Sequence, residues 1–470
     1  MASQSVLASR PRPGPASRLT VPLPYVPPRV RQFLADEAGS AAFLLVATVA
    51  ALVWANISPG EYEHFWTTPT TFSVGTWSGT LDVRHWVNDG AMAVFFLIVG
   101  LEISREATVG DLRTARRVAV PACAALGGMA LPALIYFAFE HHGAAARGWG
   151  IPISTDTAFL VGILALFGPR CPDQLRLFLL TLSIFDDIGA IAVMAVFYTP
   201  HVRFMAIVVA AVFVALLAGL RWAGVWRLWP YLLTGIALWV AIYVSGVQPT
   251  LAGVIVGLLV PASLVESEQS ERFRTFGRAV VEHADPQRAR LAASAARATV
   301  PANDRLQDAL HPVSAFVVIP VFGLANAGVS LSGPALTHAY TSTLTIGIVV
   351  ALVVGKAIGI SATSGIALRT RLGDLPGRVR YGHLIGGSVL AGIGFTISLF
   401  ITDLAFNDPI LRQDAKIGVL SGSLLAAVLG SLLLRYLGER LPLCSIDTGP
   451  PPPLPEGNWT DPSAASASRA

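Results

Sequence analysis

Two adjacent carboxylates, Asp186 and Asp187, lie near the middle of an apolar run from Leu177 to Tyr198 that is long enough to cross a bilayer as a helix. On insertion scales a carboxylate at the centre of a spanning helix costs roughly 2.5–3.5 kcal/mol, so the pair costs about 5–7 kcal/mol before the two charges repel each other. Packing alone gives no reason to keep such a cost. The pair therefore predicts a binding site for protons and small cations.

Three further ionisable residues, Glu102, Asp156 and Lys356, also lie within apolar segments. Lys356 is the most informative, because only two of the chain's 33 Lys and Arg residues are lysines, Lys356 and Lys416. A buried ammonium can release its proton, whereas a guanidinium stays charged. We therefore expect Lys356 to be the electrostatic partner of the aspartate pair. Its mid-segment position disfavours the alternative of a lysine that snorkels to the membrane surface.

Two segments carry signs of an interrupted helix. Asp156 lies in the polar run Ser154-Thr155-Asp156-Thr157 at the start of a short apolar segment, and polar side chains at that depth can replace hydrogen bonds that a broken helix loses. The later run Gly392-Ile393-Gly394 is followed by hydroxyl residues. Interrupted helices in corresponding halves predict an inverted-repeat transporter with its site where the breaks meet. Close helix packing is the alternative explanation of the glycines.

The composition indicates a membrane protein. The chain has 470 residues, of which 53% are apolar and 13% charged, and soluble domains are about a quarter charged. The net charge of +4 falls in short loops, so it indicates orientation and not binding to nucleic acid. Twelve spans are predicted: Ser40–Trp54, His85–Glu102, Ala119–Phe139, Pro152–Phe167, Leu177–Tyr198, Met205–Trp222, Trp229–Val244, Thr250–Leu264, Val313–Val329, Leu344–Leu368, His383–Phe406 and Ile417–Tyr436.

The fold class expected is therefore an all-α polytopic membrane protein with about 12 transmembrane helices, inverted-topology repeats and two crossed interrupted helices. Alternate loops are rich in arginine, which places both termini in the cytoplasm. Residues 1–32 are expected to be a disordered basic, proline-rich tail, 33–440 the membrane domain with a polar cytoplasmic loop at about 265–310, and 441–470 a second disordered tail. A mixed-charge outer loop would carry Arg412 and Lys416.

The polar segment 59–83 between the first two spans lies on the outer face in this topology. Alternation in Thr71–Thr76 and Thr80–Val83 is typical of a β-hairpin, and an irregular loop is the alternative.

The chain resembles the NhaA family of sodium/proton antiporters from about Gln32 to Tyr436. Seven motifs in the family's order carry the resemblance: Asn88–Phe96 running into Gly100-Leu101-Glu102, Thr155–Phe159, Phe185–Ala190, Thr250–Gly253, Ala325–Val329, Gly355-Lys356 and Gly392–Thr396.

The resemblance implies a role for each site residue. Asp187 would be the principal Na⁺ ligand, and Asp186 its partner, exchanging between Lys356 and the cation. Asp156 and Lys356 would balance the dipole ends of the crossed broken helices, with Thr155 beside the ion. Glu102 and Glu106 would belong to a cytoplasmic funnel, and the hairpin at 59–83 would form a homodimer.

One position departs from the family's pattern. Well-studied members have a Glu-His pair tied to pH sensing at the cytoplasmic end of the ninth helix, where this chain has Gln307 and Asp308. These two residues mark a possible pH-response region with an unknown threshold. The loop before them and both tails are also longer than usual in the family.

The function expected is electrogenic expulsion of Na⁺, and of Li⁺, in exchange for external H⁺, across the bacterial inner membrane. Membrane lipid is the expected surrounding, with no cofactor and no nucleic acid. A sodium-coupled symporter of a related fold is the nearest alternative. An intramembrane aspartyl protease is disfavoured because neighbouring aspartates point about 100° apart on one helix. A passive channel is also disfavoured, because titratable groups would obstruct conduction.

Overall fold

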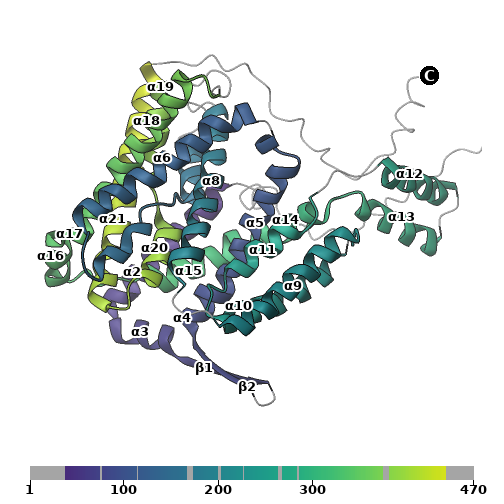
Figure 1. Cartoon of the computed structure of the whole chain (residues 1–470), viewed down its shortest axis with the longest axis horizontal. Coiled ribbons are helices and arrows are strands. Elements are labelled where there is room, and N and C mark those ends of the chain that lie inside the picture. The colour runs from purple at the N-terminus through teal and green to yellow at the C-terminus, as the bar shows by residue number, and fades with distance from the viewer. Residues whose placement is uncertain are drawn as a thin grey trace, which may run out of the picture. The chain divides into compact units, whose positions relative to one another are not determined.

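A computed structural model describes residues 37–74, 77–113, 115–166, 173–199, 203–225, 227–262, 267–282, 285–373 and 381–440. The predicted tails, 1–32 and 441–470, lie outside these residues. Within them the chain is an all-helical bundle with one short hairpin (Figure 1). The helices of its first half are α2 (Glu37–Ile57), α3 (Pro59–Thr67), α4 (Val83–His85), α5 (Met92–Thr108), α6 (Ala115–Phe139), α7 (Thr157–Leu166), α8 (Asp173–Phe197), α9 (Phe204–Trp222), α10 (Leu228–Ser245) and α11 (Leu251–Leu259).

The second half continues in the same way. Its helices are α12 (Ser267–Glu282), α13 (Pro286–Ala298), α14 (Ala302–Val313), α15 (Ile319–Asn326), α16 (Gly333–Thr341), α17 (Thr343–Val350), α18 (Lys356–Arg369), α19 (Tyr381–Leu390), α20 (Phe395–Ala405) and α21 (Pro409–Arg440). Three π-helical turns, η1 (Trp86–Ala91), η5 (Ser314–Val318) and η6 (Ala351–Gly355), join consecutive helices without a break, and such turns often occur at functional sites.

The helices have the length and apolarity of membrane spans. In the described part of the chain nine helices could each cross a bilayer, and the pair α19 and α20, bent by 45° at its break, could form a tenth span. Many of their exposed side chains are large and apolar, such as Phe204, Met205 and Val212 along α9. Such a surface suits lipid and not water, so the chain is an all-α membrane protein.

Two predicted spans are only partly helical in the described residues. Of the described residues in Pro152–Phe167 only α7 is an α-helix, and of those in Thr250–Leu264 only α11. In the first case residues 151–156 leave helical geometry, and in the second the helix ends before Val260, whose backbone is extended. A second break separates α19 from α20 at residues 391–394, where the glycines lie.

The hairpin predicted between the first two spans is present, and the segment before it is a helix that we did not predict. Strands β1 (Pro69–Val74) and β2 (Trp77–Asp82) pair antiparallel with Pro69 opposite Asp82. Helix α3 begins with Pro59, which suits a first helical position, and buries Tyr62 and Trp66, one turn apart. The Tyr62 hydroxyl lies 2.9 Å from the carbonyl oxygens of both Leu324 and Ala325, which anchors this segment on α15.

Two predicted span starts were wrong. The span expected from Val313 begins at Ala302, where Asn303 donates a buried 2.9 Å hydrogen bond from its Nδ2 to the Leu101 carbonyl and so joins α14 to α5. The segment before it, predicted as a polar loop at about 265–310, contains α12 and α13. The mixed-charge loop expected around Arg412 and Lys416 is the first two turns of α21. Charged residues lower the hydropathy of these helices, so their apolar faces were not recognised from the sequence.

Helices α5 and α11 cross at backbone contact, which only glycine permits. A Cβ atom on Gly253 would lie 2.1 Å from the Ala93 carbonyl oxygen, and one on Gly257 would lie 2.5 Å from that of Leu97. From the other helix, a Cβ atom on Gly100 would lie 2.6 Å from the Val254 carbonyl oxygen. Since these contacts are with backbone, no side chain can move to relieve them.

We predict that Gly253→Ala destabilises the protein strongly, because overpacking of a rigid contact costs about 1–3 kcal/mol or more. The melting temperature of the purified protein in detergent, measured by tryptophan fluorescence, should fall. Gly219→Ala is the control, because a Cβ atom on Gly219 in α9 would meet nothing within 4 Å and alanine favours a helix. Equal melting of the two variants would contradict the close-crossing argument.

Candidate functional site

Four segments distant in the sequence meet around the aspartate pair. Asp186 and Asp187 lie on α8, and Lys356 begins α18 directly after the π-helical turn η6. The two helix breaks, residues 151–156 and 391–394, complete the site, and the amide of Asp156 donates a 2.6 Å hydrogen bond to the Ile393 carbonyl. The residues that we predicted to act together are therefore in contact through the two breaks.

Asp186 is fully buried and tied to two partners. The Lys356 ammonium lies 2.7 Å from its Oδ2 atom, and the Thr155 hydroxyl 2.6 Å from the same oxygen. Lys356 Nζ also donates to Thr155 Oγ1 at 3.1 Å. Both charged side chains have no exposed surface, so the pair is a buried ion pair with one shared hydroxyl. The charge of Asp186 is thereby balanced inside the protein.

Asp156 joins the amino-terminal ends of two helices. Its Oδ1 atom accepts a 3.1 Å hydrogen bond from the Phe159 amide in the first turn of α7, which is the usual geometry of a helix cap. Its Oδ2 atom accepts a 2.9 Å hydrogen bond from the Thr396 amide in the first turn of α20. Both helix dipoles point their positive ends at this carboxylate, and free amides at a break inside the membrane are thereby satisfied.

At the break between α19 and α20, the carboxyl-terminal end of α19 meets a hydroxyl group and a positive charge. The Ala391 carbonyl, which follows the last residue of α19, lies 2.8 Å from the Thr155 hydroxyl. Lys356 places its positive charge against the same hydroxyl, at the negative end of the α19 dipole. Thr155 therefore links the aspartate, the lysine and the helix break.

Asp187 differs from its neighbour. Within the part of the chain that the structure describes Asp187 makes no hydrogen bond or ion pair, whereas Asp186 lacks a partner only at its Oδ1 atom. Asp187 lines a cavity of about 160 Å³ together with Thr155, Asp156 and Thr396. Ser183, one helical turn before Asp187, lines the same cavity, and its buried hydroxyl also lacks a partner among the described residues. An unbalanced carboxylate beside such oxygen atoms can take up a proton or a hard cation.

The cavity leads toward the end of the bundle where α2 begins and α5 ends, because Ser40, Glu102 and His311 line it. Glu106 lies one turn beyond Glu102 on α5 and is half-buried outside this lining. Gln307 and Asp308 lie on α14, half-buried and exposed, and neither lines the cavity.

Ser183 and His311 are among the lining residues that the sequence analysis missed. His311 lies one turn after Gln307 on α14, so helical spacing from that position was the signal that could have indicated it. Ser183 lies one turn before Asp187 and could have been found in the same way.

The motifs around residues 88–96 and 325–329 also meet. Asn326 on α15 donates a 2.7 Å hydrogen bond from its Nδ2 to the Oδ1 of Asn88, which belongs to the π-helical turn η1. The amide also lies 3.1 Å from the Phe322 carbonyl. This pair joins the two helices on the side of the bundle nearer the hairpin, away from the cavity mouth.

Comparison with known proteins indicates the same family as the sequence motifs. The family model described as Na⁺/H⁺ antiporter 1 matches residues 31–434. The chain is 59% identical over 455 residues to the Na⁺/H⁺ antiporter NhaA 3 of Frankia alni, covering 96% of this chain and 98% of that protein.

Two further relatives are less similar. The Na⁺/H⁺ antiporter NhaA of Janthinobacterium sp. is 42% identical over 414 residues, which is 85% of this chain and 91% of that protein. The Na⁺/H⁺ antiporter NhaA 1 of Mycobacterium sp. strain KMS is 46% identical over 398 residues, or 84% of this chain, and the match spans only 65% of that longer protein. With a family model that matches almost the whole membrane region, and with the buried aspartates, lysine and helix breaks in contact, the chain belongs to the Na⁺/H⁺ antiporter 1 family, among its NhaA members.

Proposed function

We propose that this protein is an electrogenic secondary transporter that expels Na⁺, and also Li⁺, in exchange for external H⁺, and so serves pH and sodium homeostasis. The observation that carries the proposal is the difference between the two aspartates: Lys356 balances Asp186, and Asp187 is left without a partner at the cavity. A relative named as a Na⁺/H⁺ antiporter is 59% identical over nearly the whole chain, which supports the same reaction.

The exchange follows from competition for the same oxygen atoms. Na⁺ enters the cavity past Glu102 and binds Asp187, and the Asp186 carboxylate turns from Lys356 to complete the ligand set. The protons on the site then leave. When protons bind again, the site is neutral and can face the other side. Two protons carry more charge than one Na⁺, so the reaction moves net charge, and the coupled acids titrate together as one unit.

The architecture that we propose has twelve spans, with α7 and α20 as the inner parts of two crossed interrupted helices in inverted repeats. Asp156 and Lys356 balance the ends of these helices, as the hydrogen bonds of Asp156 to both amide ends support. Both termini face the cytoplasm of a bacterial inner membrane. Glu102 and Glu106 belong to the cytoplasmic funnel, and Gln307 and Asp308 to a region that sets the pH response. The segment 59–83 forms a homodimer contact, with membrane lipid around it and no cofactor.

The first prediction concerns the Na⁺ ligand. Asp187→Asn should lower Na⁺ affinity roughly tenfold or more, the effect of losing at least about 1.4 kcal/mol of binding free energy, because it removes the unbalanced charge. Na⁺-driven dequenching of a ΔpH dye in everted vesicles measures this. The matched control is Asp285→Asn, since Asp285 caps α13 and pairs with the partly exposed Arg288 outside the cavity lining, and asparagine caps equally well. Dequenching at the wild-type Na⁺ concentration in Asp187→Asn would show that the assignment is wrong.

The second prediction concerns pH. If two protons compete with one Na⁺, the apparent Na⁺ KM should rise by up to about a hundredfold for each unit that the pH falls below the titration range of the site, and by about tenfold if only one proton competes. The KM at pH values from 6 to 9, by the same assay, gives this slope. A KM that stays constant over this range would exclude competition at the site.

The third prediction concerns the buried ion pair. Lys356→Met leaves the Asp186 charge without a partner, and breaking a buried pair in this way costs about 3–5 kcal/mol. The melting temperature of Lys356→Met should therefore fall well below that of the wild type. The double variant Asp186→Asn with Lys356→Met should recover most of the loss, because neither charge remains. Additive losses in the double variant would mean that the two side chains do not stabilise each other.

A further inference from the structure

The second lysine of the chain repeats the arrangement of the first. Lys416 lies in the second turn of α21, is 6% exposed, and places its ammonium 2.9 Å from Oδ1 of Asp403 on α20. In a chain with 33 Lys and Arg residues, both lysines are thus buried beside an aspartate in a spanning region. The proposed exchange at Asp186, Asp187 and Lys356 makes no use of this second pair.

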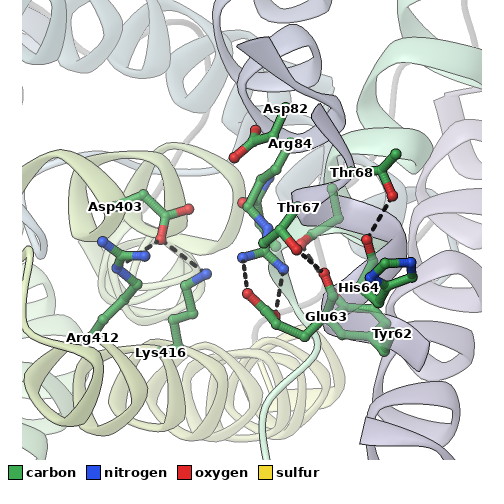
Figure 2. Close-up of polar contacts among 12 residues, drawn as sticks. Tyr62, Glu63, His64, Thr67, Thr68, Asp82, Arg84, Asp403, Arg412 and Lys416 are labelled. Carbon is green, nitrogen blue, oxygen red and sulfur yellow. Dashed lines mark hydrogen bonds and ion pairs between the residues drawn. The ribbon is translucent and has the colours of Figure 1, made fainter. Parts of the chain in front are cut away.

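The pair lies at the hairpin end of the bundle, defined as the end that carries α3, β1, β2 and the turn between α20 and α21. Figure 2 shows Lys416 and Arg412 directed at Asp403, next to the Glu63 and Arg84 pair. The Asp403 carboxylate oxygens are buried, and among the described residues Lys416 and Arg412 are the cations paired with them. The charge of Asp403 is therefore balanced by these two residues.

Positive charge surrounds Lys416. Arg412 lies on its own helix, with Nε 3.6 Å from Asp403 Oδ1, and Arg84 faces it from α4. The acids that face it are Asp403 and, through Arg84, Glu63 on α3, which holds the Arg84 guanidinium with two 2.9 Å hydrogen bonds. Asp414, two residues before Lys416 on α21, is turned away toward His338, at 3.2 Å. Burial and neighbouring cations both favour the neutral form of an amine.

The other groups of this cluster are unsuited to exchange protons. The Arg84 hydrogen bonds hold the pKa of the Glu63 carboxyl below its usual range, so Glu63 stays charged near neutral pH. Burial raises the pKa of Tyr62 to about 12, so its hydroxyl keeps its proton. Guanidinium groups stay protonated, which leaves the Lys416 amine beside Asp403 as the group that can exchange a proton.

The pair is connected to the cavity through one helix. Asp403 lies seven residues after Thr396 on α20, which places both on the same face of the helix about 10.5 Å apart along its axis. Thr396 lines the cavity, and its amide is bound by Asp156. Between them the buried Phe400 ring packs with Phe96 and Phe322, at centroid distances of 5.8 and 6.2 Å, and closes the direct route.

We infer that Lys416, held by Asp403, is the outer proton-exchange group of the transporter: it takes a proton from the external solution and passes it along α20 to the aspartate site when the Phe400 layer opens. In this step a hydronium ion of the outer solution gives its proton to the neutral amine, which forms an N–H bond and leaves water, and that bond breaks when the proton moves inward to a carboxylate oxygen of the aspartate site. The inference rests on the proposed exchange and on the orientation that places the hairpin end outside.

The need for lysine gives the decisive variant. Lys416→Arg keeps the positive charge and its ion pair with Asp403, so a structural role would tolerate it, and a guanidinium cannot give up a proton. Its rate of ²²Na⁺ uptake into everted vesicles, whose lumen is the outer side, should fall about tenfold, equal to about 1.4 kcal/mol in the barrier, with unchanged Na⁺ KM and melting temperature.

Asp403→Asn gives an independent test. Without the carboxylate the amine binds its proton less tightly, so the lumenal pH that gives half the maximal rate should fall by about one unit, equal to tenfold weaker proton binding. The cytoplasmic-side pH and Na⁺ concentration are held constant. Asp408→Asn is the matched control, since Asp408 is an exposed acid at the same end whose Oδ1 caps α21.

Wild-type rates in Lys416→Arg together with an unmoved lumenal pH profile in Asp403→Asn would overturn the inference and leave the pair a structural one. If Lys416→Arg melts early, the Asp403→Asn profile alone decides in the same way. If the proposed function itself is wrong, the wild-type protein will show no Na⁺/H⁺ exchange in these vesicles, and this result distinguishes the two failures.

Discussion

The structure around the site depends on how Asp156 satisfies the ends of two helices. A helix broken inside a membrane leaves amides that have no water to bind, and each unsatisfied group costs several kcal/mol. One carboxylate serves the first turns of both α7 and α20, which lie about 240 residues apart in the chain. The two oxygens of Asp156 bind two different helices. If α20 moves relative to α7, Asp156 must therefore move with it or one of these hydrogen bonds must break. The same contact therefore stabilises the breaks and couples them.

With the helix ends satisfied, the charges of the site are no longer equal. Asp186 is neutralised by Lys356 and by Thr155, so it contributes little net attraction for a cation in this conformation. Asp187 has no counter-charge beside the cavity and is the group that gains most from a ligand. We propose that a site built in this way binds either a proton or a cation at one carboxylate and holds the second carboxylate in reserve. The lysine makes that reserve adjustable, since an amine can release its proton.

Much of this arrangement was predictable from the sequence, and there are physical reasons why the rest was not. The cost of Asp186 and Asp187 in an apolar run indicated a site, and the single lysine of the apolar segments indicated its partner. The sequence treated the two aspartates as equals, because only the position of Lys356 in space distinguishes them. Helices α12 and α13 were missed because charged residues covered their periodicity, and α3 because its buried residues are only Tyr62 and Trp66. Contacts such as that of Thr155 with Ala391, 236 residues away, have no local signal.

The choice between lysine and arginine connects the two ends of the bundle. At an exposed position either residue would serve, and this chain almost always uses arginine there. Desolvation changes that equivalence, since a buried guanidinium remains a fixed charge and a buried amine can become neutral. Each of the two lysines has a buried carboxylate beside it. Lys356 lies beside Asp186 where the broken helices meet, and Lys416 lies beside Asp403, which is two turns along α20 from Thr396. A fixed charge at either position would hold its aspartate in one state throughout the cycle. A transporter that must change the charge of its site with each turn needs the residue that can change its own.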